Sequence, residues 1–431
     1  MRSWLTYIFL SMVACATVLT SCNNVLDEEG IAECDDRTTV RLTISFGGDG
    51  GPMSRDVGNN PAPKDDDLDY TTEEQAEIVA EDIYALVVDA SSGKFLYRIK
   101  DLQIIDGPAS DNYYTRTLEG TMIQTTQPVK IVLLANLIQN NIKVSETTYL
   151  DSKAKVEALI DSYDQNNVQT LTTVSTIYNQ LIYNYDGTIT TDSETKTQVG
   201  TGPWSLSNRR IPMWGESQLT TVPPEPGVTL TCYLYRALAK VQIWVNGKQG
   251  IDGFEINSIT VNNIHTKGYC VSQATTFDED GPNYDLDGNG TYDVLPYALP
   301  SIPDNPGTQN VTYGSVDSPL NVTDAYSDMI YLPEKINKGV NNPVTIIVNY
   351  TYNKTLYEGI IRFTEGGVED QSKAFDIIRN HSYIFNINVS NDAEPAMYYE
   401  VINWTSVNNG TLNFGNGNGD VTNPNGNTTI E

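Results

Sequence analysis

The chain has 431 residues and a formal net charge of −29, with 55 acidic and 26 basic side chains. This length gives room for two domains with separate hydrophobic cores. Because a protein that neutralises phosphates needs a basic surface, the charge excludes a nucleic-acid-binding protein. The acidic balance instead favours solubility outside the cell.

The N-terminal segment has the pattern of an export signal. One basic residue, Arg2, precedes an apolar stretch over residues 5–19 that is too short to span a bilayer as a mature helix. The following Leu19-Thr20-Ser21-Cys22 resembles the lipobox of bacterial lipoproteins, in which the cysteine is lipidated and becomes the new N-terminus. An ordinary signal peptide with an unrelated cysteine is the alternative. We therefore expect a signal peptide over residues 1–21 and a lipid anchor on Cys22.

The first strand after this leader has one apolar face. Alternation with polar residues predicts a strand whose buried face is formed by Val40, Leu42, Ile44 and Phe46. A run rich in Gly and Pro then leads to Arg55, in a segment that proteases can reach. A cut after Arg55 would detach the strand. Arg37 and Arg41 are competing cleavage points, and a cut at Arg37 would retain the strand. We interpret residues 22–55 as a propeptide with a removable first strand; a permanent first strand is the alternative.

The rest of the first half combines strands with two short helices. After a polar linker, strands are predicted over residues 83–88, 95–99, 112–123 and 129–137, the last apolar enough to be buried on both faces. In residues 150–163 and 168–181 the apolar side chains recur at helical spacing. Because Pro223, Pro224 and Pro226 follow soon afterwards, the first domain is predicted to span residues 56–216.

The second half reads almost entirely as strands. Apolar residues alternate in one phase up to Leu234 and in the other phase from Ala237, so a bulge or a corner between two sheets is predicted near Arg236. Further strands are predicted over residues 254–261, 329–332, 344–352, 357–363 and 383–389. Many short strands separated by turns are typical of β-sandwiches. We therefore expect a mainly β protein with two β-sandwich domains in tandem, the second over residues 217–396.

The C-terminal segment, residues 397–431, is predicted to replace the first strand of a neighbouring molecule. Removal of that strand would leave an apolar groove with unpaired backbone groups, which is a template for another strand. The donor residues would be Met397, Tyr399, Val401, Trp404, Leu412 and Phe414. Because donor and groove lie at opposite ends of the chain, the contact does not close on itself and a filament follows. The alternative is a final strand with a flexible, Asn- and Gly-rich end.

Several stretches, in this order, resemble the fimbrillin family, the pilin subunits of type V pili. Besides the lipobox, the first strand and Arg55, they are residues 129–136, 211–216, 236–241, 331–334 and 378–383 and a strand containing Trp404. The resemblance implies two transthyretin-like β-sandwich domains and a precursor anchored in the outer membrane. It also implies cleavage by an arginine-specific protease, strand exchange with other copies or other fimbrial subunits, and a place in a cell-surface fimbrium that supports adhesion. The subunit could form the stalk, the tip or the anchor.

One loop resembles a calcium-binding loop. Asp285, Asp287, Asn289 and Asp293 stand at positions one, three, five and nine, with glycine at position six. Pro296 occupies position twelve, where a bidentate Glu is expected. The loop is either a calcium site or an acidic, turn-rich connection, and no other cofactor is expected.

Candidate catalytic groups are few. The chain has 2 histidines, and a structural hydrogen bond is expected for His381; the sequence has no GxSxG motif or phosphate loop, so we do not expect an enzyme. Cys232 and Cys270 either form a disulfide or are buried free thiols. The 26 tyrosines could form platforms for sugars, so a lipid-anchored glycan-binding protein is the alternative function.

Overall fold

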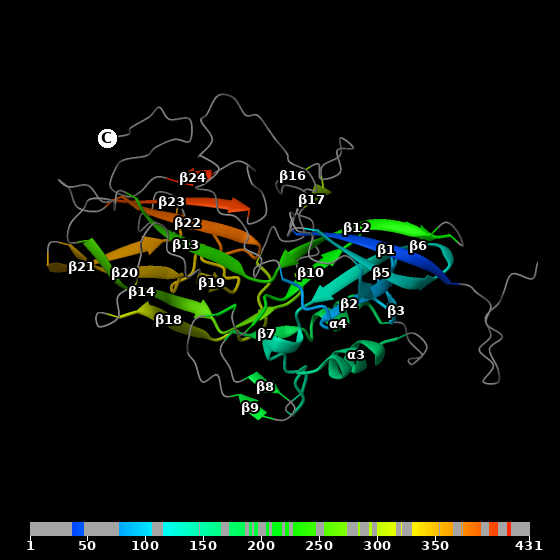
Figure 1. Ribbon diagram of the computed structural model, residues 1–431. Helices are drawn as coiled ribbons and strands as arrows, with labels where there is room; N and C mark the ends of the chain where they lie inside the picture. The colour runs from blue at the N-terminus through cyan, green and yellow to red at the C-terminus, as the bar shows by residue number, and fades with distance from the viewer. Residues whose placement is uncertain are drawn as a thin grey trace, which may run out of the picture. The chain divides into compact units, whose positions relative to one another are not determined.

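Strands form most of the regular structure in the computed structural model of the chain (Figure 1). The structure describes residues 37–46, most of residues 77–388, and the strands at 396–403 and 412–414; not described are mainly 1–36, 47–76, 106–114, 165–171, 186–208, 224–226, 247–253, 274–299, 316–329, 365–371, 389–395 and 404–431, apart from short stretches within them. The described α-helices are α3 (Lys153–Asp161) and α4 (Val174–Tyr178), and a 3₁₀ turn, η2, spans Ile138–Asn140. Both predicted helices and the mainly β fold are confirmed. No described helix is long and apolar enough to cross a membrane.

The N-terminal sheet contains nine described strands. Its order is β3-β2-β6-β10-β12-β1-β5-β4, and β11 pairs with β6 beside β10. The strands are β1 (Arg37–Phe46), β2 (Ile83–Asp89), β3 (Phe95–Ile99), β4 (Gln103–Ile104), β5 (Thr115–Ile123), β6 (Thr125–Ala135), β10 (Met213–Glu216), β11 (Thr220–Val222) and β12 (Val228–Arg236). The sheet therefore extends to Arg236, twenty residues past the predicted domain end at 216, because β11 and β12, on either side of the prolines at 223, 224 and 226, both belong to it.

The central strands of this sheet are buried on both faces. In β2, Ile83, Ala85 and Val87 belong to one hydrophobic core, which we call the inner core, while Tyr84 and Leu86 belong to a second, larger core. Strand β6 alternates in the same way, which confirms the prediction for residues 129–137. Helices α3 and α4 contribute to the larger core and lie beside β2 and β3 (Figure 1).

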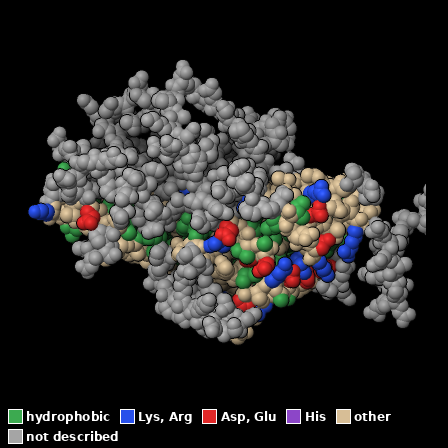
Figure 2. Space-filling model, viewed as in Figure 1, with side chains coloured by type: hydrophobic (Ala, Val, Ile, Leu, Met, Phe, Trp, Pro, Cys, Tyr) green, Lys and Arg blue, Asp and Glu red, His purple; other side chains and the backbone are tan. Residues whose placement is uncertain are grey.

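Helix α3 is also tied to β3 by charges. Arg98 donates to Asp161 at 3.0 and 2.9 Å and to Glu157 at 2.9 Å. Figure 2 shows acidic and basic side chains mixed over this region. Because the two carboxylates stand four residues apart on one helix, they face the same guanidinium group.

Two sheets form the second half of the fold. One has the order β19-β13-β22-β23-β24 and the other β18-β14-β20-β21. Their strands are β13 (Ala239–Asn246), β14 (Phe254–His265), β18 (Thr308–Gly314), β19 (Ile330–Leu332), β20 (Thr345–Tyr352), β21 (Thr355–Arg362), β22 (His381–Asn388), β23 (Ala396–Asn403) and β24 (Leu412–Phe414). Val241 and Phe385 from one sheet and Val261 and Ile346 from the other lie in the same core, so the two sheets form a sandwich (Figure 1).

The chain passes between the sheets at Arg236. Strand β12 belongs to the N-terminal sheet and β13, which begins three residues after it ends, belongs to the sandwich. The predicted change of phase is therefore a corner between two sheets. Three two-stranded pairs complete the described strands: β7 (Ile182–Asn184) with β15 (Lys267–Tyr269), β8 (Ile189–Thr191) with β9 (Glu194–Lys196), and β16 (Asn283–Tyr284) with β17 (Asp293–Val294).

Candidate functional site: the place of the first strand

Strand β1 lies inside the N-terminal sheet, not at its edge. It is hydrogen-bonded between β12 and β5, and it runs parallel to β12 in a register that pairs Val40 with Val228 and Phe46 with Leu234. Both neighbours therefore use backbone groups to hold it. Loss of β1 would leave two facing rows of unpaired donors and acceptors, with an apolar floor between them.

The side chains of β1 fill the inner core. Val40, Leu42 and Ile44 are each 0% exposed, so the predicted buried face is observed at these three positions. The side chain of Phe46 lies outside the described residues. Burial of each such side chain contributes about 1.5–3 kcal/mol, or roughly 5–9 kcal/mol for the three before entropy. This is comparable with the whole stability of a typical domain, about 5–15 kcal/mol.

Two contacts mark the edges of the strand. The Arg41 guanidinium donates to the Glu119 carboxylate on β5 at 2.8 Å, and the two side chains are 60% and 28% exposed. On the other side, Gly227 has φ +98°, and a Cβ at that position would lie 2.8 Å from the Thr39 carbonyl oxygen. Glycine thus permits the backbone of the neighbouring segment to approach β1 closely.

One cysteine lies beside β1, on the neighbouring strand β12. Cys232 pairs with Ile44 in the strand register, and both side chains belong to the inner core. Cys232 and Cys270 are both free and buried, and burial raises the pKa of each thiol well above its usual range. The interpretation of these two residues as buried free thiols is therefore correct, and Cys232 is a natural reporter of the presence of β1.

The predicted donor segment forms the last strands of the sandwich. Strand β23 pairs antiparallel with β22, so that Met397, Tyr399 and Val401 stand opposite Ile387, Phe385 and Tyr383, and β24 pairs with β23 through Leu412 and Phe414. These two strands end the described order of that sheet. Trp404 lies outside the described residues.

Most of the other predicted site residues have no described position. Cys22, Arg55, Asp285, Asp287 and Asn289 lie outside the described residues, and Asp293 lies in β17 with its side chain not described. Arg37 is exposed at the start of β1. In the part of the chain that the structure describes, no cluster of three or more His, Cys, Asp or Glu side chains could hold a metal ion.

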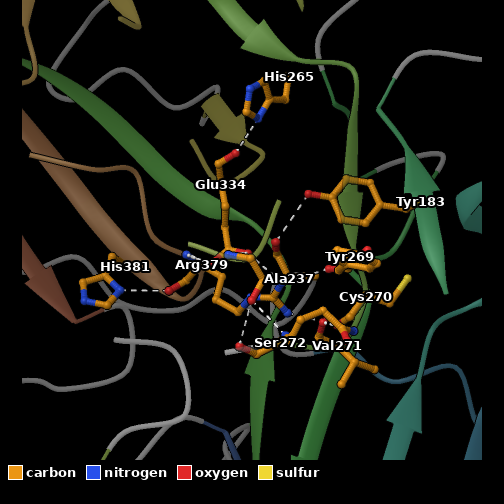
Figure 3. A network of polar contacts seen from close by, with 12 residues as sticks. Tyr183, Ala237, His265, Tyr269, Cys270, Val271, Ser272, Glu334, Arg379 and His381 are labelled. Carbon is orange, nitrogen blue, oxygen red and sulfur yellow. Dashed lines mark hydrogen bonds and ion pairs between the residues drawn. The ribbon is translucent and has the colours of Figure 1, made fainter. Parts of the chain in front are cut away.

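A buried ion pair joins stretches of the sandwich that lie far apart in the sequence (Figure 3). Arg379 and Glu334 have side chains 1% and 2% exposed, and their charged groups are 2.6 Å apart. The guanidinium group also donates to the Tyr269 and Cys270 carbonyls at 3.0 and 3.2 Å. Glu334 accepts from the backbone N–H groups of Ser301 and Arg379 as well. The two buried charged groups thus form an ion pair with each other, and each is also hydrogen-bonded to backbone groups.

The corner of the chain is attached to the same region. Asn380, in the left-handed conformation at φ 56°, donates from its backbone to the Leu238 carbonyl at 2.9 Å. Its side-chain oxygen accepts from the Arg236 backbone N–H at 3.2 Å. The stretches 236–241, 331–334 and 378–383 therefore meet in space. The sequence alone does not show that these three stretches meet. Its one signal for such a contact is a charged residue directly beside an apolar run.

Both histidines bond to backbone carbonyl groups. The Nδ1 atoms of His265 and His381 lie 2.8 Å from the carbonyl oxygens of Glu334 and Arg379, respectively (Figure 3). Each Nδ1 therefore carries the proton and donates it. Burial lowers the pKa of both imidazoles, and that of His265 falls to about 4. The structural role predicted for His381 is observed.

Protonation of His265 is expected to destabilise the fold in acid. Desolvation and the nearby Lys335 lower its pKa from 6.5 to about 4. As the pH falls, the unfolded chain binds this proton first, so stability decreases between those two pKa values, by up to about 3 kcal/mol. His265→Asn, whose amide can still donate to the Glu334 carbonyl, is expected to lose less stability over this range. Urea unfolding at about pH 4.5 and about pH 7 measures the difference.

The matched control is His381→Asn, which leaves the His265 imidazole in place. This control should retain the acid-induced loss that His265 causes. If the wild type and His265→Asn lose equal stability between about pH 7 and about pH 4.5, protonation of His265 does not cause the acid-induced loss.

No protein-family profile and no curated protein sequence matches the chain. Among solved structures, it is similar to the tip fimbrial protein Mfa3 from Porphyromonas gingivalis, at 11% identity over 85% of this chain and 100% of that one, with a TM-score of 0.45. A fimbrial assembly protein from Parabacteroides distasonis is 14% identical over 85% and 96%, with a TM-score of 0.39. The fimbrial anchor protein Mfa2 from P. gingivalis is 9% identical over 85% and 98%, with a TM-score of 0.27.

Proposed function

We propose that the chain is a structural subunit of a cell-surface fimbrium of type V, which supports adhesion. It is exported as a lipoprotein precursor anchored in the outer membrane through Cys22, is cut after Arg55 by an arginine-specific protease, and then assembles by strand exchange. The observation that carries this proposal is the position of β1, an N-terminal strand held inside a sheet by hydrogen bonds on both sides. A cut after Arg55 would leave this strand attached by non-covalent contacts alone.

The tail supplies the other half of the exchange. Strands β23 and β24 are the last two in the order of their sheet, so they can leave it by breaking the ladder between β22 and β23 alone. The segment that contains them would then enter the groove of a neighbouring subunit, either a copy of the chain or another fimbrial subunit. A groove at one end of the chain and a donor at the other produce a head-to-tail filament.

Limited cleavage tests the release of β1. In the intact protein Cys232 is buried beside Ile44 of this strand and is expected not to react with a thiol reagent. After a low dose of trypsin, mass spectrometry should show the loss of residues up to Arg55, and Cys232 should become reactive. Cys232→Ser identifies the signal, and Cys270, in the other core, should stay protected. If Cys232 stays protected in the cut protein, β1 does not leave the sheet and the proposal is contradicted.

Deletion of residues 397–431 separates donor from acceptor. The truncated subunit should still expose Cys232 after the cut but should no longer extend an SDS-resistant ladder when it is mixed with the other fimbrial subunits. Continued extension by the truncated protein would exclude the tail as donor and would favour a subunit at the tip.

A further inference from the structure

The inner core that β1 closes contains no buried aromatic side chain among the described residues. All buried members of the inner core that the structure describes are aliphatic residues, methionine or cysteine. Val40, Leu42 and Ile44 are completely enclosed there, and Val228, Leu230 and Cys232 lie beside them in the register. A tyrosine in place of one of the three would overpack this core and would bury a hydroxyl group among apolar side chains. The groove therefore requires aliphatic side chains at three alternate positions.

The edge of the groove adds a charge requirement. Arg41 is the residue after Val40, the first of the three buried positions. Its guanidinium donates a hydrogen bond to the Glu119 carboxylate on β5 at 2.8 Å. A strand that replaces β1 in the same register places its own residue opposite this carboxylate. A basic residue there restores the ion pair, whereas an acidic residue brings two like charges together.

The chain's own tail does not meet these requirements in any register. With Met397, Tyr399 and Val401 in the three positions, Tyr399 takes the place of Leu42. A shift by two residues places Tyr399 and Asn403 in the core and Glu400 opposite Glu119. With Leu412 and Phe414 in the last two positions, a ring replaces Ile44 and Gly410 leaves the first position empty.

The geometry points to a donor strand from a different protein, with aliphatic residues at three alternate positions and Lys or Arg after the first of them. This inference rests on the proposed strand exchange and narrows its partner, since the sequence predicted self-assembly into a homopolymer. The net charge of −29 also favours a donor from a different protein. Copies of the chain repel one another, whereas a basic strand is attracted.

Synthetic peptides test the requirement on trypsin-cut protein. The probes are the sequence of residues 37–46, the same peptide with Leu42→Tyr, the same peptide with Arg41→Glu, and the sequence of residues 396–405. Protection of Cys232 from a thiol reagent reports occupancy of the groove. We expect the first peptide to protect, and Leu42→Tyr to bind at least about tenfold more weakly. Arg41→Glu should bind roughly three- to tenfold more weakly, with a difference that shrinks at about 1 M salt. The tail peptide should bind at least as weakly as Leu42→Tyr.

The outcomes separate this inference from the proposed function. If the tail peptide protects Cys232 at the same concentration as the first peptide, the donor is a copy of this chain and the inference is overturned. Equal binding of the Arg41→Glu peptide would remove the charge requirement. If Cys232 stays protected after the cut without any peptide, β1 does not leave, and strand exchange itself fails.

Discussion

Replacing Leu42 with alanine is expected to lower the free energy of unfolding by about 2–5 kcal/mol. Leu42 is 0% exposed at the centre of β1, and its side chain belongs to the inner core. Truncation removes apolar contacts and leaves a cavity between β12 and β5. Urea unfolding of the uncut protein measures the loss of stability, and the reaction rate of Cys232 with a thiol reagent, which should increase, reports the weaker hold on β1.

The matched control is Arg41→Ala, one residue away on the same strand. Its ion pair with Glu119 is largely exposed, so the expected loss is at most about 1 kcal/mol. If Leu42→Ala cost no more than Arg41→Ala, the side chains of β1 would not form part of the inner core. The groove would then have no apolar floor to offer a donor strand.

Glu334→Gln is expected to destabilise the protein by about 3–5 kcal/mol. The variant keeps the shape of the side chain and an oxygen that can accept a hydrogen bond, but it leaves the Arg379 guanidinium buried without its counter-charge. The corner of the chain is held beside this pair through Asn380, so the loss should spread to the junction between β12 and β13. Thermal and urea unfolding measure the effect.

Two variants show whether the effect comes from an unpaired buried charge. Glu119→Gln makes the same substitution in an exposed pair and should cost at most about 1 kcal/mol. In the double variant Glu334→Gln/Arg379→Met the unpaired charge is removed, so part of the stability should return, and the two substitutions should not be additive. Additive losses would show that the two side chains stabilise the fold independently.

Local periodicity predicted much of the secondary structure. Residues 40–46 alternate as a strand does, and Val40, Leu42 and Ile44 are buried in the structure. The apolar run of residues 129–137 is buried on both faces as β6, and the change of phase at Arg236 is the corner between two sheets. Both helices also formed where the spacing changed. These features follow from which side chains are apolar, and that information lies within a few residues of each position.

The tertiary structure alone decided which strands are neighbours. The alternation in β1 could not show that this strand runs parallel to β12 and lies inside the sheet, or that Cys232 lies beside Ile44. Nor could it show that Glu334 and Arg379 form a buried pair, or that β11 and β12 belong to the first sheet. The sequence determined the strand, its apolar face and its basic residue. Strand pairing depends on contacts between residues far apart in the chain, so only the folded structure shows that this strand closes an aliphatic groove.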